Sequence, residues 1–338
     1  MQVDTVMLPH LAEELRLIYF AKILHRRYAS NNIYENLQDI ESLFRDPESY
    51  FSEHGARQII TIQGDDDNMP SEHERGNNLN EPEFSQDENG RSLQYVGGGE
   101  LISGRRIDGH VLAVYRGCPT FRVAVDQVTW LFKPLNVQEK LPDQFYDEVR
   151  EMLGKHNNDW SAILSDISYK SPIKKLYDNY IGEHRRNSHS LLLRHEPEQY
   201  SRLCEMNHFY CNFCKCIQRY DNCWHECMNR CCFTNNSAAT VLLGDLKLCK
   251  KALSVLERES YINNQDSIVL LPHHGASSGD TMQIDKMCDR AVLAVSYGEN
   301  YKYRHPKFIY DDKIARITNR VAFVNENQDF SYHITSWN

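Results

Sequence analysis

Two apolar runs of the sequence end abruptly in side chains that bind metal ions. Residues 267–271 lead into Pro272, His273, His274 and Gly275, and residues 239–243 lead into Gly244 and Asp245. Both runs are continuous rather than alternating, which is typical of strands that are buried on both faces. Carboxylate oxygen and imidazole nitrogen together suit zinc, iron or manganese, and the end of a strand holds such ligands rigidly. The two runs, about one helical segment apart, predict a metal site.

Four landmarks in the same order resemble the metallo-β-lactamase superfamily, and within it the ComEC-like branch, named after the DNA-uptake competence protein. They are Asn-Ser-His-Ser-Leu-Leu-Leu at 187–193, the strand at 239–245 that ends in Asp245, the His-His-Gly motif within 270–275, and Ser-Tyr-Gly-Glu-Asn at 296–300 followed by His305-Pro306. Residues 128–134 are similar to the strand that leads into this half. The resemblance covers roughly residues 120–338.

The resemblance implies an α+β or α/β fold, the four-layer αββα sandwich, formed by a single domain over residues 1–338. Its parts would be a degenerate N-terminal part, a mobile acidic loop, a central part, a Cys-rich insertion and a C-terminal half that carries the metal site. Their expected bounds are 1–63, 64–91, 92–200, 201–236 and 237–338. The acidic loop has almost no large apolar residues, so burial cannot offset the entropy cost of ordering it.

The first metal motif of the superfamily, H-x-H-x-D-H, is degenerate in this chain. Aligned on Pro9-His10, one histidine remains, and Leu8, Ala12 and Glu13 stand at ligand positions. Either Glu13 or Glu14 would have to substitute for a lost ligand. We expect a shortened or degenerate member of the superfamily, or one whose first segment was lost, so two-metal catalysis is in question.

The resemblance implies a role for each remaining polar landmark. Asp245 would be the bridging or terminal carboxylate, and one of His273 and His274 a metal ligand, with the other orienting a ligand or touching substrate. The further metal ligands would be His10 and His189. The histidine near the substrate face would be His305, a general acid that together with Asp245 carries catalysis. The substrate-binding residues would be Asn300 and Lys302.

Three of these residues also have an ordinary structural interpretation. Asp245 would cap a helix that begins near Leu246, since aspartate is a preferred N-cap residue. His274, which precedes Gly275, would be a turn residue, and His305 a loop histidine.

Eight of the eleven cysteines lie between Cys204 and Cys232. The C-x-x-C spacing at 211–214 lets two thiolates bind one tetrahedral zinc. The spacing at 223, 227 and 231 places three sulfurs along one face if that stretch is helical. An insertion of this length has no apolar core of its own, so we expect structural zinc. The expected zinc ligands are Cys211, Cys214, Cys223, Cys227, Cys231 and Cys232. A disulfide cluster, an iron–sulfur cluster or a redox sensor are the alternatives, and the isolated Cys118, Cys249 and Cys288 are expected to be buried small hydrophobes.

Composition excludes several classes of protein. A net charge of -9 argues against a broad nucleic-acid-binding face, although local basic groups exist, at 247–251 and at 302–307 among others. The 302–307 group is the best candidate for steering a phosphate. No apolar run approaches the roughly 20 residues that span a bilayer, and no basic start with an apolar h-region is present. We therefore expect a soluble, cytoplasmic protein without a membrane partner.

Hydrophobic periodicity predicts the elements that must position these residues. The expected helices are 11–27, 33–44 and 246–258, with 144–154 and 158–166 helical or irregular. The expected strands are 58–62, 92–96, 111–115, 190–194, 239–244, 267–271, 291–296 and 331–336, with 92–96 paired to 111–115.

Two functions of different classes follow. The first is a metal-dependent hydrolase of a phosphodiester, plausibly a nucleic acid or nucleotide, using one or two zinc ions or manganese. The second is a catalytically impaired scaffold whose zinc-binding Cys-rich insertion binds a partner protein or nucleic acid. A redox or metal sensor that uses the same cysteines is a third, weaker option.

Overall fold

The computed structural model describes most of the chain in segments. These are residues 3–28, 37–64, 93–125, 128–138, 141–165, 167–182, 189–198, 201–205, 239–263, 268–275, 278–288, 291–297, 321–324 and 333–336. Contacts divide the chain into two compact units. Unit 1 holds residues 1–85, 100–117 and 138–189, and unit 2 holds 86–99, 118–137 and 190–338. The single-domain organisation over 1–338 stays a prediction.

Unit 1 contains a four-stranded mixed sheet in the order β1-β2-β5-β4. The strands β1 (Thr5–Pro9), β2 (Gln58–Gln63) and β5 (His110–Arg116) are parallel, and β4 (Glu100–Ile107) is antiparallel to β5. One face packs Ile59 and Leu112 with Phe51 of the short helix α3 (Pro47–Glu53). Asp46 caps α3, because its carboxylate accepts a hydrogen bond from the Ser49 amide. This sheet places His10 directly after the end of β1.

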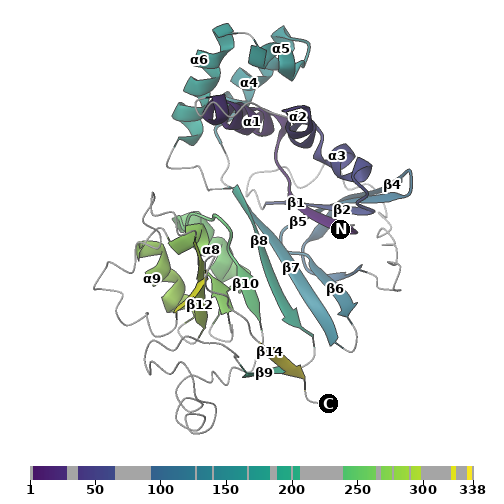
Figure 1. The fold of residues 1–338 in the computed structure, drawn as a ribbon, viewed down its shortest axis with the longest axis vertical. Coiled ribbons are helices and arrows are strands. Elements are labelled where there is room, and N and C mark those ends of the chain that lie inside the picture. The colour runs from purple at the N-terminus through teal and green to yellow at the C-terminus, as the bar shows by residue number, and fades with distance from the viewer. Residues whose placement is uncertain are drawn as a thin grey trace. The chain divides into compact units, whose positions relative to one another are not determined.

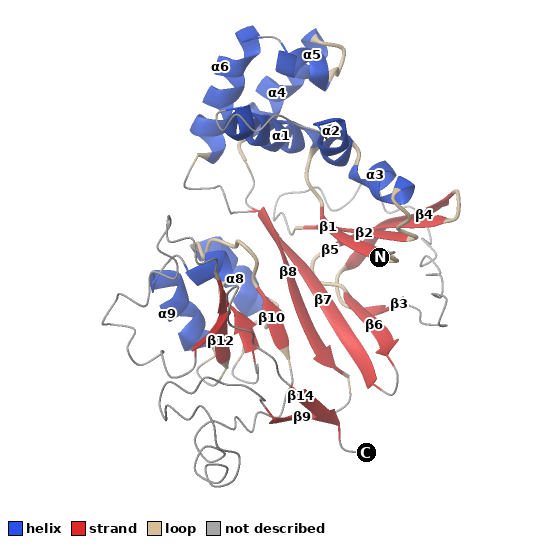
Figure 2. Ribbon diagram, viewed as in Figure 1, coloured by secondary structure: helices blue, strands red, loops and turns tan. Residues whose placement is uncertain are grey.

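The remaining helices of unit 1 share one apolar core around Trp160 and Phe145, whose side chains are both fully buried. Figure 2 shows these helices gathered together. They are α1 (Glu13–Tyr28), α2 (Leu37–Arg45), α4 (Asp143–Lys155), α5 (Trp160–Ser165), α6 (Ile167–Leu176) and the π-helical turn Tyr177–Ile181. The prediction of a well-buried helix over 11–27 is confirmed, because apolar residues recur on more than one face of α1.

Unit 2 is built on an eight-stranded sheet in the order β13-β12-β11-β10-β8-β7-β6-β3 (Figure 1). The strands are β13 (Val321–Val324), β12 (Val292–Ser296), β11 (Ile268–Leu270), β10 (Thr240–Leu242), β8 (His189–Pro197), β7 (Val128–Gln138), β6 (Thr120–Val125) and β3 (Leu93–Gly97). Strands β10 to β13 are parallel, and β8 is antiparallel to β10. Helices α8 (Lys250–Arg258) and α9 (Ser278–Met287) contribute to the main core of this unit, and β9 (Ser201–Glu205) pairs with β14 (His333–Ser336).

Most predicted elements are present, but two predictions are wrong. Residues 92–96 and 111–115 do not pair, since β3 pairs with β6 in unit 2 and β5 pairs with β2 and β4 in unit 1. The helix expected over 246–258 begins at Lys250, because Leu246 and Leu248 alternate into the core along an extended loop. The predicted acidic loop beyond Gly64 lies outside the described residues.

Within the described ranges the fold is mixed α/β, with two mixed sheets and eight α-helices. It is compatible with an α+β sandwich, and the four-layer arrangement stays a proposal. Over the same ranges no helix is both long and apolar enough to cross a membrane.

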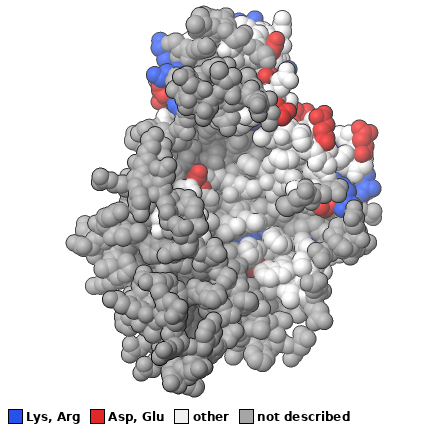
Figure 3. Space-filling view, viewed as in Figure 1, with Lys and Arg blue, Asp and Glu red and all other residues white. Residues whose placement is uncertain are grey.

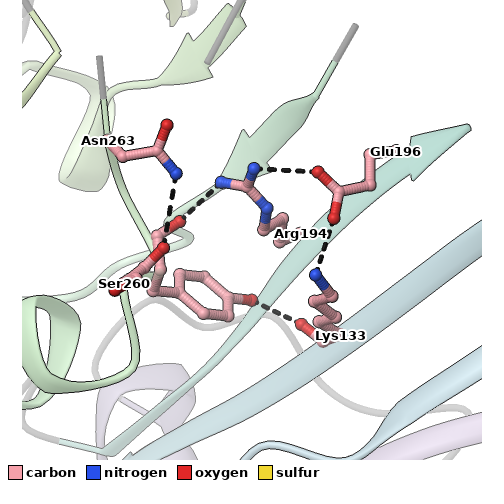
Figure 4. A network of polar contacts seen from close by, with 6 residues as sticks. Lys133, Arg194, Glu196, Ser260 and Asn263 are labelled. Atoms are coloured by element: carbon pink, nitrogen blue, oxygen red, sulfur yellow. Dashed lines mark hydrogen bonds and ion pairs between the residues drawn. The ribbon is translucent and has the colours of Figure 1, made fainter. Parts of the chain in front are cut away.

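A partly buried network of charges joins β7, β8 and the segment after α8 in unit 2 (Figure 4). Arg194, only 7% exposed, binds Glu196 at 2.9 Å and donates a second hydrogen bond to the Tyr261 carbonyl at 3.0 Å. Lys133 binds the other oxygen of Glu196 at 2.6 Å, and the Tyr261 hydroxyl donates to the Lys133 carbonyl at 2.7 Å. Burial by itself raises the pKa of Glu196, but the Arg194 and Lys133 charges outweigh it and hold the pKa below its usual value.

Removing Glu196 should therefore destabilise the protein. We expect Glu196→Ala to lower the free energy of unfolding by about 2–3 kcal/mol, because Arg194 stays buried without its anion. The folded pKa of Glu196 is depressed, so its contribution is present at neutral pH and is lost as the pH falls through that value. The difference between wild type and variant, measured by urea unfolding, should shrink as the pH falls below the ordinary range of a glutamate pKa.

The more exposed ion pair of Arg122 with Glu198 supplies the control. Glu198→Ala should cost less than about 1 kcal/mol, since exposed pairs contribute little. Equal losses for the two variants would contradict the view that Arg194 and Glu196 form a buried structural pair.

Candidate metal centre

Asp245 and His273 follow two neighbouring parallel strands. Strands β10 and β11 pair in register from Thr240 opposite Ile268 to Leu242 opposite Leu270. Because the carboxyl ends of parallel strands meet at one edge of a sheet, the residues after them come together. The structure thus brings together two of the side chains that the sequence singled out.

The two strand ends are also joined by the backbone. The His273 amide donates a hydrogen bond to the Gly244 carbonyl at 2.9 Å, and the Leu271 amide donates to Ala294 of β12 at 2.8 Å. The Asp245 Oδ1 and His273 Nδ1 atoms lie 3.8 Å apart, with the side chains 63% and 42% exposed. Zinc binds nitrogen and oxygen at about 2.0–2.2 Å in tetrahedral geometry, so two donors on one ion lie about 3.3–3.6 Å apart. The pair at 3.8 Å is slightly wider than this, so a shared ion requires the two side chains to move a few tenths of an ångström closer.

Both histidines adopt the left-handed backbone conformation. His273 has φ 52° and ψ 41°, and His274 has φ 54° and ψ 30°. A residue other than glycine costs of order 1–3 kcal/mol there and persists only where its surroundings determine it. Here Pro272 and Gly275 on either side are buried. Such strain clusters at functional sites, so it supports a functional rather than an ordinary turn at this position.

His274 is anchored to a third strand end. Its Nδ1 atom donates a hydrogen bond to the carbonyl oxygen of Ser296, the last residue of β12, at 2.6 Å. The proton therefore sits on Nδ1, and Nε2 carries the lone pair that binds a metal or a proton. The sequence did not predict the hydrogen bond of His274 to the Ser296 carbonyl, although Ser296 is the first residue of the Ser-Tyr-Gly-Glu-Asn landmark.

Asp245 does not cap the following helix. Helix α8 begins five residues later, at Lys250, and its N-cap is Cys249, whose sulfur accepts a hydrogen bond from the Ala252 amide at 3.5 Å. The capping interpretation of Asp245 is therefore wrong. Cys249 is half-buried and has this capping role, whereas Cys288 is buried as expected and Cys118 is half-buried.

The N-terminal candidates belong to unit 1. His10 is exposed, and its amide donates to the Ile62 carbonyl at 2.7 Å. Desolvation by surrounding atoms lowers the pKa of His10, and the positive charge of Arg16 lowers it further because it repels the protonated imidazole. The lowered pKa favours the neutral imidazole, which is the form that binds metal. Glu14 binds Arg150 at 2.6 Å, and Glu13 accepts a hydrogen bond from the Trp160 indole at 3.3 Å. These two structural contacts disfavour Glu13 and Glu14 as substitute ligands.

The other candidate residues are placed only in part. His189 is the first residue of β8. Asn300, Lys302, His305 and the expected zinc ligands of the insertion lie outside the described residues. Over the segments that are described, no group of three or more His, Cys, Asp or Glu side chains could hold a metal ion. The described site is therefore the Asp245–His273 pair with His274 beside it.

Comparisons of the chain with protein-family models, with curated proteins and with solved structures found no match.

The turn at Gly244 makes a testable contribution to this site. Gly244 has φ 54°, and an added Cβ would meet only the Leu191 carbonyl, at 3.6 Å. The cost of Gly244→Ala is therefore conformational, and we expect a loss of about 1 kcal/mol or more in stability, measured by thermal unfolding. Because Asp245 follows directly, zinc affinity should fall as well.

Gly154 in α4 is the matched control, because an added Cβ there meets nothing within 4 Å and its φ is not positive. Gly154→Ala should stabilise the protein by about 0.5–1 kcal/mol. If both variants raised the melting temperature, the left-handed turn at Gly244 would be refuted.

Proposed function

We propose that this protein is a metal-dependent hydrolase of the metallo-β-lactamase type that cleaves a phosphodiester in a nucleic acid or nucleotide. The observation that carries the proposal is the 3.8 Å approach of Asp245 to His273 at the ends of two parallel strands. Ordered sequence landmarks that resemble the ComEC-like branch add support.

The residues of the site take distinct roles in this proposal. Asp245 and His273 hold the metal, zinc or manganese, and His274 is fixed by Ser296 beside them. When bound, such an ion lowers the pKa of its water toward neutrality and polarises a phosphoryl oxygen. The roles of His10 and His189 as further ligands stay predictions from the resemblance. His305 is proposed to donate a proton to the leaving oxygen, and Asn300 and Lys302 to bind substrate.

A scaffold function is the alternative, and one observation favours it. The described residues supply only a pair of metal donors, fewer than the three protein ligands usual for catalytic zinc. In this alternative the Cys-rich insertion, with structural zinc, binds a partner protein or nucleic acid in the cytoplasm. The first residues of the insertion form β9, which pairs with β14, and its expected zinc ligands lie outside the described residues.

Metal content separates the two functions. Zinc and manganese per chain should be measured by elemental mass spectrometry for the wild type, for an Asp245→Ala, His273→Ala, His274→Ala triple variant and for a Cys211→Ser, Cys214→Ser variant. The hydrolase proposal predicts that the triple variant loses about one ion while keeping the metal of the insertion. The cysteine variant should lose a different ion and keep the first, with the cleavage of a chromogenic phosphodiester abolished only in the triple variant.

An unchanged metal content in the triple variant would overturn the hydrolase proposal. The same result, with metal lost from the cysteine variant, would favour the scaffold.

A further inference from the structure

A lysine shares the loop that carries Asp245. The loop runs from Leu243 to Cys249 and connects β10 to α8. Leu246 and Leu248 are buried in the core of unit 2, whereas Asp245 and Lys247 are exposed. Alternate burial along the loop therefore leaves Asp245 and Lys247 both exposed, two residues apart.

Three backbone hydrogen bonds hold this loop in place. The Leu246 amide donates to Leu243 at 3.2 Å, and the Cys249 amide donates to Lys247 at 2.8 Å. The third joins His273 to Gly244 and ties the loop to the histidine turn. Two residues along an extended chain lie at most about 7 Å apart, a distance comparable to the reach of a lysine side chain. Lys247 is therefore close enough in the chain to reach an anion bound to a metal ion held by Asp245 and His273.

A cation near Asp245 would offset the repulsion between this site and an anionic substrate. The chain has a net charge of -9, and the Asp245 carboxylate repels a phosphodiester. On the face shown in Figure 3, the charged side chains of the described residues do not merge into a broad basic surface. An anionic substrate then needs a local cation, and lysine is a compact point charge that pairs well with phosphate oxygens.

We infer that Lys247 binds the anionic phosphate group of the substrate at the Asp245–His273 site, and so selects phosphodiesters over neutral esters. The inference rests on the proposed hydrolase function. It adds Lys247 to the substrate-binding residues Asn300 and Lys302 of that proposal.

Two substrates with the same leaving group test the inference. Bis(4-nitrophenyl) phosphate is anionic and 4-nitrophenyl acetate is neutral, and both release 4-nitrophenolate. Lys247→Ala should lower kcat/KM for the phosphodiester roughly three- to tenfold, because the attraction between the Lys247 ammonium and the substrate phosphate is lost. The decrease should be smaller at high salt, since salt screens this attraction in the wild type. Turnover of the acetate and the zinc content should not change. Lys247→Arg should retain most of the activity, and Lys286→Ala, which removes an exposed lysine of α9, should have no effect.

Binding of inorganic phosphate to the zinc-loaded full chain, measured by calorimetry, keeps the test independent of turnover. If Lys247→Ala binds phosphate more weakly than the wild type and Lys286→Ala do, the inference is supported even when neither ester is cleaved. The absence of cleavage of both esters would count against the hydrolase function only. Equal phosphate binding by the three proteins, no phosphate binding by the wild type, or equal losses on both esters would overturn the role of Lys247.

Discussion

The parallel pairing of β10 with β11 is the constraint on which the candidate site depends. Val241 and Val269 face each other in this register and are fully buried, so the core beneath the sheet fixes the alignment. A slip of one residue would turn these side chains to the other face and move the strand ends about 3.3 Å apart. It would also break the hydrogen bond from His273 to Gly244, and with it the approach of His273 to Asp245.

The strained backbone of the two histidines is stabilised by the pairing of the neighbouring strands rather than by the histidines' own contacts. His273 and His274 occupy a conformation that their own residue type disfavours, and their polar side chains are partly exposed. What compensates is the pairing of three strand ends, with Ser296 of β12 fixing the His274 ring. A rigid sheet edge that orients imidazoles before any ion arrives reduces the entropy cost of binding that ion.

The sequence predicted strands better than it predicted their partners. Continuous apolar runs at 239–243 and 267–271 identified β10 and β11, and the residues just after them identified Asp245 and His273. The separation of 92–96 from 111–115 into different sheets was missed, because strand pairing is non-local and leaves no periodicity to read. The left-handed conformation of His273 and His274 could not be predicted from the sequence either, since that conformation is typical of glycine or asparagine.

Placement of one ion between Asp245 and His273 is the central claim, and anomalous diffraction at the zinc absorption edge tests it most directly. Crystals of the zinc-loaded full chain should show an anomalous peak within bonding distance of the Asp245 carboxylate and the His273 imidazole. Peaks confined to the cysteines between 204 and 232 would contradict it, and would leave the sheet edge without a metal function.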